Sequence, residues 1–235
     1  MITITPTPAS PVIGPRKELS GTRRSMRSIL LTLLAFGAVL PTAVAQQRPG
    51  TSPQIAAEER YYRLVTVPVP ENVVLEVGGL ATIPGGGLAV ATRRGEVWTI
   101  DDPYMERSSR PHFSRFAEGL HEPLGLAYRD GSLYTTQRSE LTRLTDLDGD
   151  GRADRYETIH SWPLSGNYHE YSYGPVFTPE GKMRVTLNLA WIGHGASLAK
   201  WRGWAVEIDD DGELTPFATG LRSPAGYGYN LEGDL

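Results

Sequence analysis

Short apolar segments rich in β-branched and aromatic residues alternate along the chain with turns of glycine and acidic residues. Beyond the first 45 residues, no stretch has apolar residues at the 3.6-residue spacing of an amphipathic helix. This pattern predicts an all-β protein. The expected strands form three groups of four, namely Arg63–Val67, Val73–Val77, Leu88–Thr92 and Val97–Ile100; Leu124–Tyr128, Leu133–Thr136, Leu141–Thr145 and Tyr156–His160; and Gly174–Phe177, Met183–Leu187, Trp204–Ile208 and Leu214–Phe217.

A sequence motif occurs twice with the same spacing. The segments Phe116–Tyr128 and Phe217–Tyr229 both read F-A-x-G-L-x-x-P-x-G-x-x-Y, and the second lies 101 residues after the first. Weaker relatives of these segments end in similar glycine turns. Aligning the apolar residue after each turn gives Leu88, Leu133, Met183 and Leu235, which are 45, 50 and 52 residues apart. A period near 50 with short strands is typical of the four-stranded blades of a β-propeller.

The repeat also predicts how many blades the chain contains. Leu235 aligns with Leu133, so the chain ends inside the fourth copy of the repeat. A closed propeller of six blades at this period needs roughly 300 residues, and closure removes open strand edges. We therefore expect residues 61–235 to form about three blades and the start of a fourth, as the N-terminal part of a six-bladed propeller.

The first 45 residues have the organisation of a secretory signal peptide. A basic segment at 23–27 precedes an apolar run at 29–39, and Ala43-Val44-Ala45 forms a small-x-small cleavage site. The apolar run is shorter than the ~20 residues that a helix needs to span a bilayer, which favours a cleaved signal peptide. The alternative is an uncleaved membrane anchor. Met26 is an alternative start, because a complete signal follows it. We expect a periplasmic or secreted protein with a polar linker at 46–60 and no membrane span after cleavage.

Composition narrows the classes of partner and chemistry. The 235 residues, 40% of them hydrophobic and 21% charged, are typical of a globular protein. A net charge of −4 gives no general basic field, so we expect no nucleic-acid partner. The lack of cysteine excludes disulfides, thiolate metal sites and a cysteine nucleophile. No phosphate-binding glycine loop, G-x-S-x-G or H-E-x-x-H motif is present, so nucleotide-dependent chemistry and zinc proteolysis lack support.

The segment from Asp146 to Glu157 matches the calcium-loop pattern D-x-[DN]-x-[DN]-G-x5-E at every defined position. No helical pattern flanks it, so we expect a structural calcium ion between two strands. The alternative is a solvated acidic hairpin turn, although its four clustered aspartates would repel one another without a cation. The expected ligands are the side chains of Asp146, Asp148 and Asp150, the carbonyl of Arg152, Asp154 through water, and both carboxylate oxygens of Glu157.

His169 is the first candidate for catalysis. It lies in the aromatic and polar connection 167–174, which leads into a strand, and propellers place ligand-facing groups in such connections. Its imidazole can take a proton from a substrate hydroxyl, with Glu170 or a backbone carbonyl orienting the ring. The alternative is a structural loop held by tyrosine stacking. His194, which lies between two glycines, is a weaker candidate.

Arg222 is the candidate for binding an anionic or quinone-type group. It occupies the position in the second motif copy that His121 has in the first, so the two copies differ at one ligand-capable residue. A guanidinium offers five donors in a rigid fork that suits carboxylates and quinone oxygens. The alternative is a surface arginine paired with a carboxylate.

Two segments resemble motifs of the soluble quinoprotein glucose/sorbosone dehydrogenase-like family of six-bladed propellers. Residues 220–227, G-L-R-S-P-A-G-Y, resemble the family pattern G-x-R-N-P-x-G-L, with Ser223 in place of the asparagine. Residues 177–182, F-T-P-E-G-K, resemble the strand and turn that follow the family's catalytic histidine, but the Gly-Gly pair after that histidine is missing after His169. The resemblance covers about residues 70–235.

The resemblance implies an exported dehydrogenase that oxidises a sugar hydroxyl by hydride transfer to pyrroloquinoline quinone (PQQ). Arg222 and Ser223 would bind the cofactor, His169 would be the general base, and the partner would be a small sugar-type substrate; the electron acceptor stays open. A non-catalytic propeller that binds carbohydrate or protein is one alternative, favoured by Ser223 and by the missing Gly-Gly. The second is a lactonase-type hydrolase, whose central metal would need inward-facing carboxylates.

Overall fold

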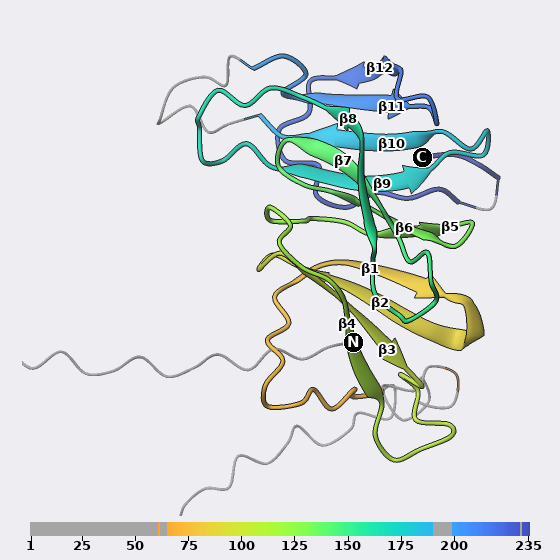
Figure 1. Ribbon diagram of the computed structural model, residues 1–235. Coiled ribbons are helices and arrows are strands. Elements are labelled where there is room, and N and C mark those ends of the chain that lie inside the picture. Colours follow the sequence, from red (N-terminus) through yellow and green to blue (C-terminus); the bar gives the residue numbers. More distant parts are fainter. Residues whose placement is uncertain (1–60, 62–64, 190–198, 231) are drawn as a thin grey trace, which may run out of the picture. The chain divides into compact units, whose positions relative to one another are not determined.

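The computed structural model describes residues 61, 65–189, 199–230 and 232–235, so the predicted signal peptide and linker lie outside the described residues. Residues Val67–Leu235 form one compact unit that contains three four-stranded antiparallel sheets (Figure 1). The sheets contain β1 (Val77–Ile83), β2 (Gly87–Thr92), β3 (Glu96–Asp101) and β4 (His112–Ala117); β5 (Ala127–Arg129), β6 (Ser132–Thr136), β7 (Glu140–Thr145) and β8 (Arg155–Ser161); and β9 (Ser172–Phe177), β10 (Met183–Leu187), β11 (Trp204–Ile208) and β12 (Leu214–Thr219).

Each sheet is an antiparallel meander whose strands lie side by side in chain order. This is the blade of a β-propeller, and we call the three sheets blade 1, blade 2 and blade 3. Apart from a single 3-10 turn at Pro84–Gly86, the described residues contain no helix, and none of their helical structure is long and apolar enough to cross a membrane. The all-β propeller prediction is therefore confirmed, and every strand boundary in blades 2 and 3 lies within three residues of its predicted position.

The prediction for blade 1 was wrong in its first half. Its first strand is β1, whereas the described residues 65–76, predicted to contain parts of two strands, contain none. Pro68 and Pro70 cannot donate to a strand ladder, and they directly follow residues 65–67, the described part of the first segment, which lie outside the sheet. The fourth strand of the blade is β4, in a segment for which no strand was predicted. Its sequence, HFSRFA, has few apolar residues, because most of the strand's side chains are only partly buried. The apolar pattern therefore did not identify it as a strand.

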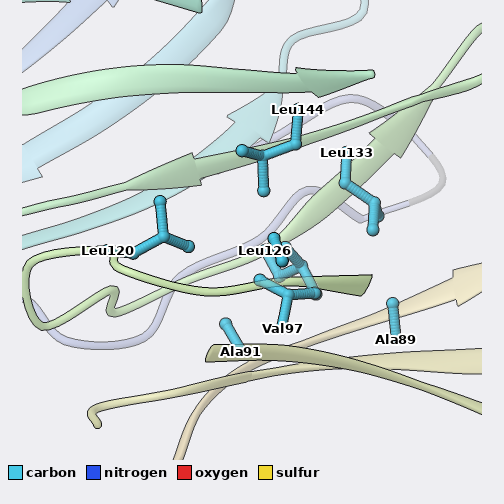
Figure 2. Close-up of a cluster of buried hydrophobic side chains, with 8 residues drawn as sticks. Ala89, Ala91, Val97, Leu120, Leu126, Leu133 and Leu144 are labelled. Atoms are coloured by element: carbon cyan, nitrogen blue, oxygen red, sulfur yellow. The ribbon is translucent and has the colours of Figure 1, made fainter. Parts of the chain in front are cut away.

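The core lies between neighbouring blades. The central strands β6 and β10 are buried along their whole length, as expected for strands covered on both faces. One apolar cluster joins blade 1 to blade 2, and Figure 2 shows Ala89, Ala91 and Val97 of blade 1 close to the leucines of blade 2. A second cluster joins blades 2 and 3 and includes Leu141, Met183 and Val206, all fully buried.

Successive blades meet through glycines that lie in or just before their first strands. A Cβ atom added to Gly79 would overlap the backbone of Gly125, and one added to Gly125 would overlap the carbonyl oxygen of Gly174. The backbone N–H of Gly174 donates to the carbonyl of Leu124 at 3.2 Å, and the Thr136 hydroxyl donates to the Gly174 carbonyl at 2.8 Å. Adjacent blades therefore approach at backbone distance, which only residues without a side chain allow.

Candidate functional site

The structure places His169 and Arg222 at the same end of blade 3. In this sheet Leu187 pairs with Ser172 and Trp204 pairs with Thr219, so β9 begins at the end where β12 finishes. His169 precedes β9 by three residues, and Arg222 follows β12 by three. The two predicted site residues, 53 positions apart in sequence, thus emerge from one edge of one sheet.

The segment directly after β10 forms hydrogen bonds to the loops that carry these two residues. The N–H of Leu189 donates to the carbonyl of Arg222 at 2.8 Å, and the N–H of Asn188 donates to the carbonyl of Tyr171 at 3.1 Å. The side-chain oxygen of Asn188 accepts the N–H of Tyr171 in return. One short stretch of backbone therefore holds both the loop that carries His169 and the loop that carries Arg222.

His169 is half-buried against an aromatic neighbour. Its ring centroid lies 4.2 Å from that of Tyr168, and its backbone N–H donates to the side-chain oxygen of Asn167 at 3.0 Å. Glu170 is fully buried, and its carboxylate accepts hydrogen bonds from the backbone N–H and the hydroxyl of Ser165 at 2.7 and 2.6 Å. The buried Glu170 thus anchors the loop, while the histidine remains partly accessible.

Arg222 and Ser223 are both exposed. In the part of the chain that the structure describes, the Arg222 guanidinium forms no ion pair, so the surface-pair alternative finds no partner there. The two motif copies occupy corresponding places: Leu221 donates its N–H to Gly203 before β11, as Leu120 donates to Gly95 before β3, each at 3.0 Å. The guanidinium at this end is therefore available to a ligand.

Two arginines that the sequence analysis did not single out support the His169 loop. Arg138 donates to the carbonyls of Asn167 at 3.0 Å and Glu170 at 3.3 Å, and it pairs with the Glu122 carboxylate at 3.2 Å. Arg202, only 6% exposed, donates to the carbonyl of Tyr171 at 2.8 Å. Arg138 lies between β6 and β7, and Arg202 lies between β10 and β11. The loop is therefore held in position by two arginines from other connections.

Burial determines the electrostatics of Arg202. It lowers the pKa of this guanidinium to about 10, while the charge of Glu170 acts in the opposite direction and that of Arg138 adds to the lowering. The Arg202 Nε atom is buried without a hydrogen-bond partner. For Arg138 the sequence does hold a signal, because Arg93 follows the second strand of blade 1 as Arg138 follows that of blade 2. Arg202 has no such counterpart in this comparison.

The acidic loop joins β7 and β8, as the strand pattern predicted. Carboxylate oxygens of Asp146, Asp148 and Asp154 lie within 4.8 Å of one another. The loop is folded by its own side chains: Asp146 accepts the N–H groups of Gly149 at 2.7 Å and Gly151 at 2.9 Å, and Asp154 accepts that of Leu147 at 2.7 Å. Three of the predicted metal ligands are therefore already gathered.

The other predicted ligands have different surroundings. The Asp150 carboxylate accepts the backbone N–H of Arg152 at 2.8 Å. Glu157 lies in β8, where Arg143 of β7 is its cross-strand neighbour and donates to it from Nε at 3.0 Å. The pKa of Arg143 is raised, chiefly by this hydrogen bond. The structure thus keeps Glu157 in the sheet and apart from the aspartate cluster. His194 lies outside the described residues.

Comparison with solved structures supports the class of fold. An oxidoreductase (glucose dehydrogenase) from Thermus thermophilus matches with 21% identity and a TM-score of 0.52, over 67% of this chain and 56% of that one. The PQQ-bound aldose sugar dehydrogenase of Streptomyces coelicolor matches with 16% identity and a TM-score of 0.47, over 60% and 46%. Virginiamycin B lyase of Staphylococcus aureus matches with 14% identity and a TM-score of 0.45, over 69% and 48%.

The likeness to the Thermus thermophilus protein bears on the fold alone, and with the three four-stranded meanders that fold is a β-propeller. The chain spans about half the length of the solved structures that it matches. No family model matches the sequence, and no curated protein matches it.

Proposed function

We propose that this protein is a propeller oxidoreductase of the PQQ-dependent sugar dehydrogenase type. The observation that carries the proposal is the placement of His169 and Arg222 at one end of blade 3, in loops joined through Asn188 and Leu189. A proton acceptor and an available cation at the same edge are the two groups that such an oxidation needs. The motif resemblance around residues 177–182 and 220–227 agrees with this assignment.

The residues present fit a quinone with anionic substituents. Arg222 has an exposed guanidinium without an ion-pair partner in the described chain, and Ser223 beside it offers a hydroxyl. Both are donors, as the oxygens of PQQ require. When bound, PQQ supplies a two-electron acceptor for the hydride that leaves the sugar carbon.

The chain's own residues supply proton transfer and electrostatic stabilisation. His169 would accept the proton of the sugar hydroxyl at a ring nitrogen as that carbon is oxidised. Tyr168, packed against the imidazole, would restrict the orientation of the ring. Arg138 and Arg202 would hold the loop in position through their hydrogen bonds to its backbone carbonyls. Arg222 would place positive charge where negative charge develops on the acceptor.

The proposal includes export of the mature protein, on the signal-peptide pattern of the first 45 residues.

The proposal also includes a structural calcium ion in the acidic loop. Asp146, Asp148 and Asp154 fit a cation, because three carboxylates with oxygens within 4.8 Å of one another repel without one. The carboxylates of Asp150 and Glu157 do not belong to this group of three. The ion would therefore be held by three aspartates, with the remaining positions filled by carbonyls or water.

A lactonase-type hydrolase finds less support at this end of the blades. A central metal would need free carboxylates, but Glu122 is paired with Arg93 and Arg138, and Glu170 accepts two hydrogen bonds from Ser165. Carboxylates engaged in this way have fewer oxygen lone pairs left for a metal ion. A non-catalytic carbohydrate-binding propeller remains the competing class for the experiment to separate.

The test uses the full-length natural protein, purified without cofactor. It is titrated with PQQ in the presence of calcium while dye reduction by a panel of aldoses is followed, and Arg222→Ala and His169→Ala are compared with Arg110→Ala and His112→Ala, which alter exposed residues of the same types. We expect saturable reduction in the wild type and both controls. His169→Ala should lose turnover but still bind PQQ, and Arg222→Ala should weaken PQQ binding.

One outcome would overturn the whole proposal, and another would overturn only its residue assignments. If the wild type does not bind PQQ at micromolar concentration, the oxidoreductase assignment fails and the carbohydrate-binding propeller becomes the better account. If turnover occurs but is unchanged in both site variants, the dehydrogenase stands while the assignment of His169 and Arg222 fails.

A further inference from the structure

A polar cavity lies beside blade 1 and shares no lining residue with the loops that carry His169 and Arg222. It has a volume of about 350 Å³, within the usual range for small-ligand pockets. Blade 1 and the acidic loop of blade 2 both contribute to its lining. The polar residues that line it are Asn72, Arg94, Glu96, Trp98, Arg115 and Arg152. A neighbouring cavity of about 430 Å³ shares Arg115 and Arg152 with it, so the two form one extended polar surface.

The charge of this cavity is opposite to that of the protein as a whole. Three arginines and one glutamate line it, whereas the chain carries a net charge of −4. Arg115 is paired with Glu96 at 3.5 Å and with Glu118 at 3.0 Å. Arg94 and Arg152 are exposed and form no ion pair within the described residues. Two guanidinium groups are thus left to attract an anion.

Trp98 provides a fixed apolar surface between these cations. Its indole Nε1 donates to the Glu96 carboxylate at 3.0 Å, which holds the ring in place. Trp98 and Arg115 are cross-strand partners in β3 and β4, so their side chains share one face of the sheet. The ring is half-buried, and Val74 beside it is 51% exposed.

We infer that this cavity binds an acidic saccharide, that is, a sugar carrying a carboxylate or sulfate group. The apolar face of a sugar ring packs on an indole, and a guanidinium binds a carboxylate or sulfate through two parallel hydrogen bonds. Asn72 adds donors and acceptors for hydroxyl groups. The cavity contains none of the residues assigned to the dehydrogenase site, so the inference does not depend on the proposed function.

The test is calorimetric titration with a trimer of galacturonic acid at low ionic strength, with maltotriose and sodium sulfate titrated in parallel. We expect saturable binding of the trimer that weakens as salt is added, and none of maltotriose. Arg94→Ala and Arg152→Ala together should raise the Kd at least about tenfold, because each removes a charge-assisted contact. Arg110→Ala, an exposed arginine outside the cavity, should leave the Kd unchanged.

A second readout reports on Trp98 directly. Trp98→Phe keeps an aromatic ring on the sheet, so calorimetric binding should persist while the ligand-induced change in tryptophan fluorescence is lost. Absence of trimer binding, or a Kd unaffected by the arginine double variant, would overturn the inference. Equal affinity for sulfate and for the trimer would overturn the saccharide assignment.

Discussion

Gly125 and Gly174 lie so close together that a Cβ atom on Gly125 would overlap the carbonyl oxygen of Gly174. Gly125 also has a φ of 144°, a conformation that side chains rarely adopt. The contact joins the segment just before β5 in blade 2 to β9 in blade 3. It is made by backbone atoms on both sides, so no side-chain rotation can relieve an overlap there.

Gly125→Ala is therefore expected to destabilise the protein strongly. Backbone strain of about 1–3 kcal/mol adds to an overpacking cost of about 1–3 kcal/mol, which gives a loss of about 2–6 kcal/mol in the free energy of unfolding. Urea denaturation measures this loss. Gly226→Ala is the control, because a Cβ there meets nothing within 4 Å and the φ is not positive. Equal stability of the two variants would contradict the contact.

The leucines between blades 1 and 2 permit a similar comparison. Leu144 is fully buried in the cluster that Figure 2 shows, whereas Leu147, three residues later, is 62% exposed. Leu144→Ala should lower the free energy of unfolding by about 2–5 kcal/mol, because it leaves a cavity in the core. Leu147→Ala should change it by less than about 0.5 kcal/mol. A loss of the same size in both variants would contradict the assigned core.

Calcium should stabilise the protein through the aspartate cluster. If the site has the affinity usual for extracellular modules, about 10 mM calcium should raise the free energy of unfolding by about 1.5–3 kcal/mol. Asp146→Asn and Asp148→Asn should abolish that gain, which thermal unfolding with and without calcium would detect. Asp211→Asn, in an acidic turn without this spacing, serves as the control. Glu157→Gln separates two ligand sets: retention of the gain would support the three-aspartate site, and its loss would favour the full loop pattern.

Asp102 should make stability depend on pH in the acid range. Burial acts to raise the pKa of its carboxyl, but hydrogen bonds from the backbone N–H groups of Ser108, Arg107 and Glu106, at 2.8–3.0 Å, outweigh it and hold the pKa below the ordinary value of 3.8. A lowered carboxyl pKa contributes stability above the unfolded pKa, and that contribution disappears as pH falls through the folded pKa.

The stability difference between wild type and Asp102→Asn should thus be largest above about pH 5 and should shrink steadily below about pH 4. Urea unfolding at a series of pH values provides the measurement. Asp211→Asn serves as the control for the loss of an exposed carboxylate. A difference that stays constant from neutral pH down to about pH 3 would mean that the hydrogen bonds do not favour the ionised form.

Arg138 should control the mobility of the loop that carries His169. Lysine at this position keeps the charge but loses the planar fork that reaches Glu122 and the carbonyls of Asn167 and Glu170 together. We expect amide hydrogen exchange in residues 165–171 to rise about 5- to 30-fold in Arg138→Lys. Arg155→Lys, exposed and 3.8 Å from its carboxylate partner, should leave this exchange unchanged. Unchanged exchange in both variants would remove Arg138 from the loop's support.

The sequence predicts blades 2 and 3 well because their signals are local. Alternating apolar residues bounded by glycine turns at Asp130-Gly131 and Glu180-Gly181 specify a strand and its reversal without reference to the rest of the chain. Blade 1 lacks this regularity: an apolar segment with prolines precedes it, and β4 has few apolar residues. The local pattern could not show which of these two segments forms a strand of blade 1. The pairing of β4 with β3 in the folded structure does.

The site was predictable only in part for the same reason. The aspartate spacing and the motif around Arg222 are visible in the chain. The ion pair between Glu157 and Arg143 depends on the register of the β7–β8 hairpin. The position of the His169 loop depends on hydrogen bonds from Arg138 and Arg202, which lie in other connections. Such contacts join residues that a linear pattern does not relate, so they require the folded structure.

The glycine contacts between successive blades have an evolutionary consequence. Because adjoining blades touch there through backbone atoms, the interface has nearly the same shape whatever side chains the outer loops carry. A duplicated blade can then diverge in its loops, as the exchange of His121 for Arg222 between the two motif copies illustrates, without any compensating change in its neighbour. New binding chemistry can arise in such a row of blades one blade at a time.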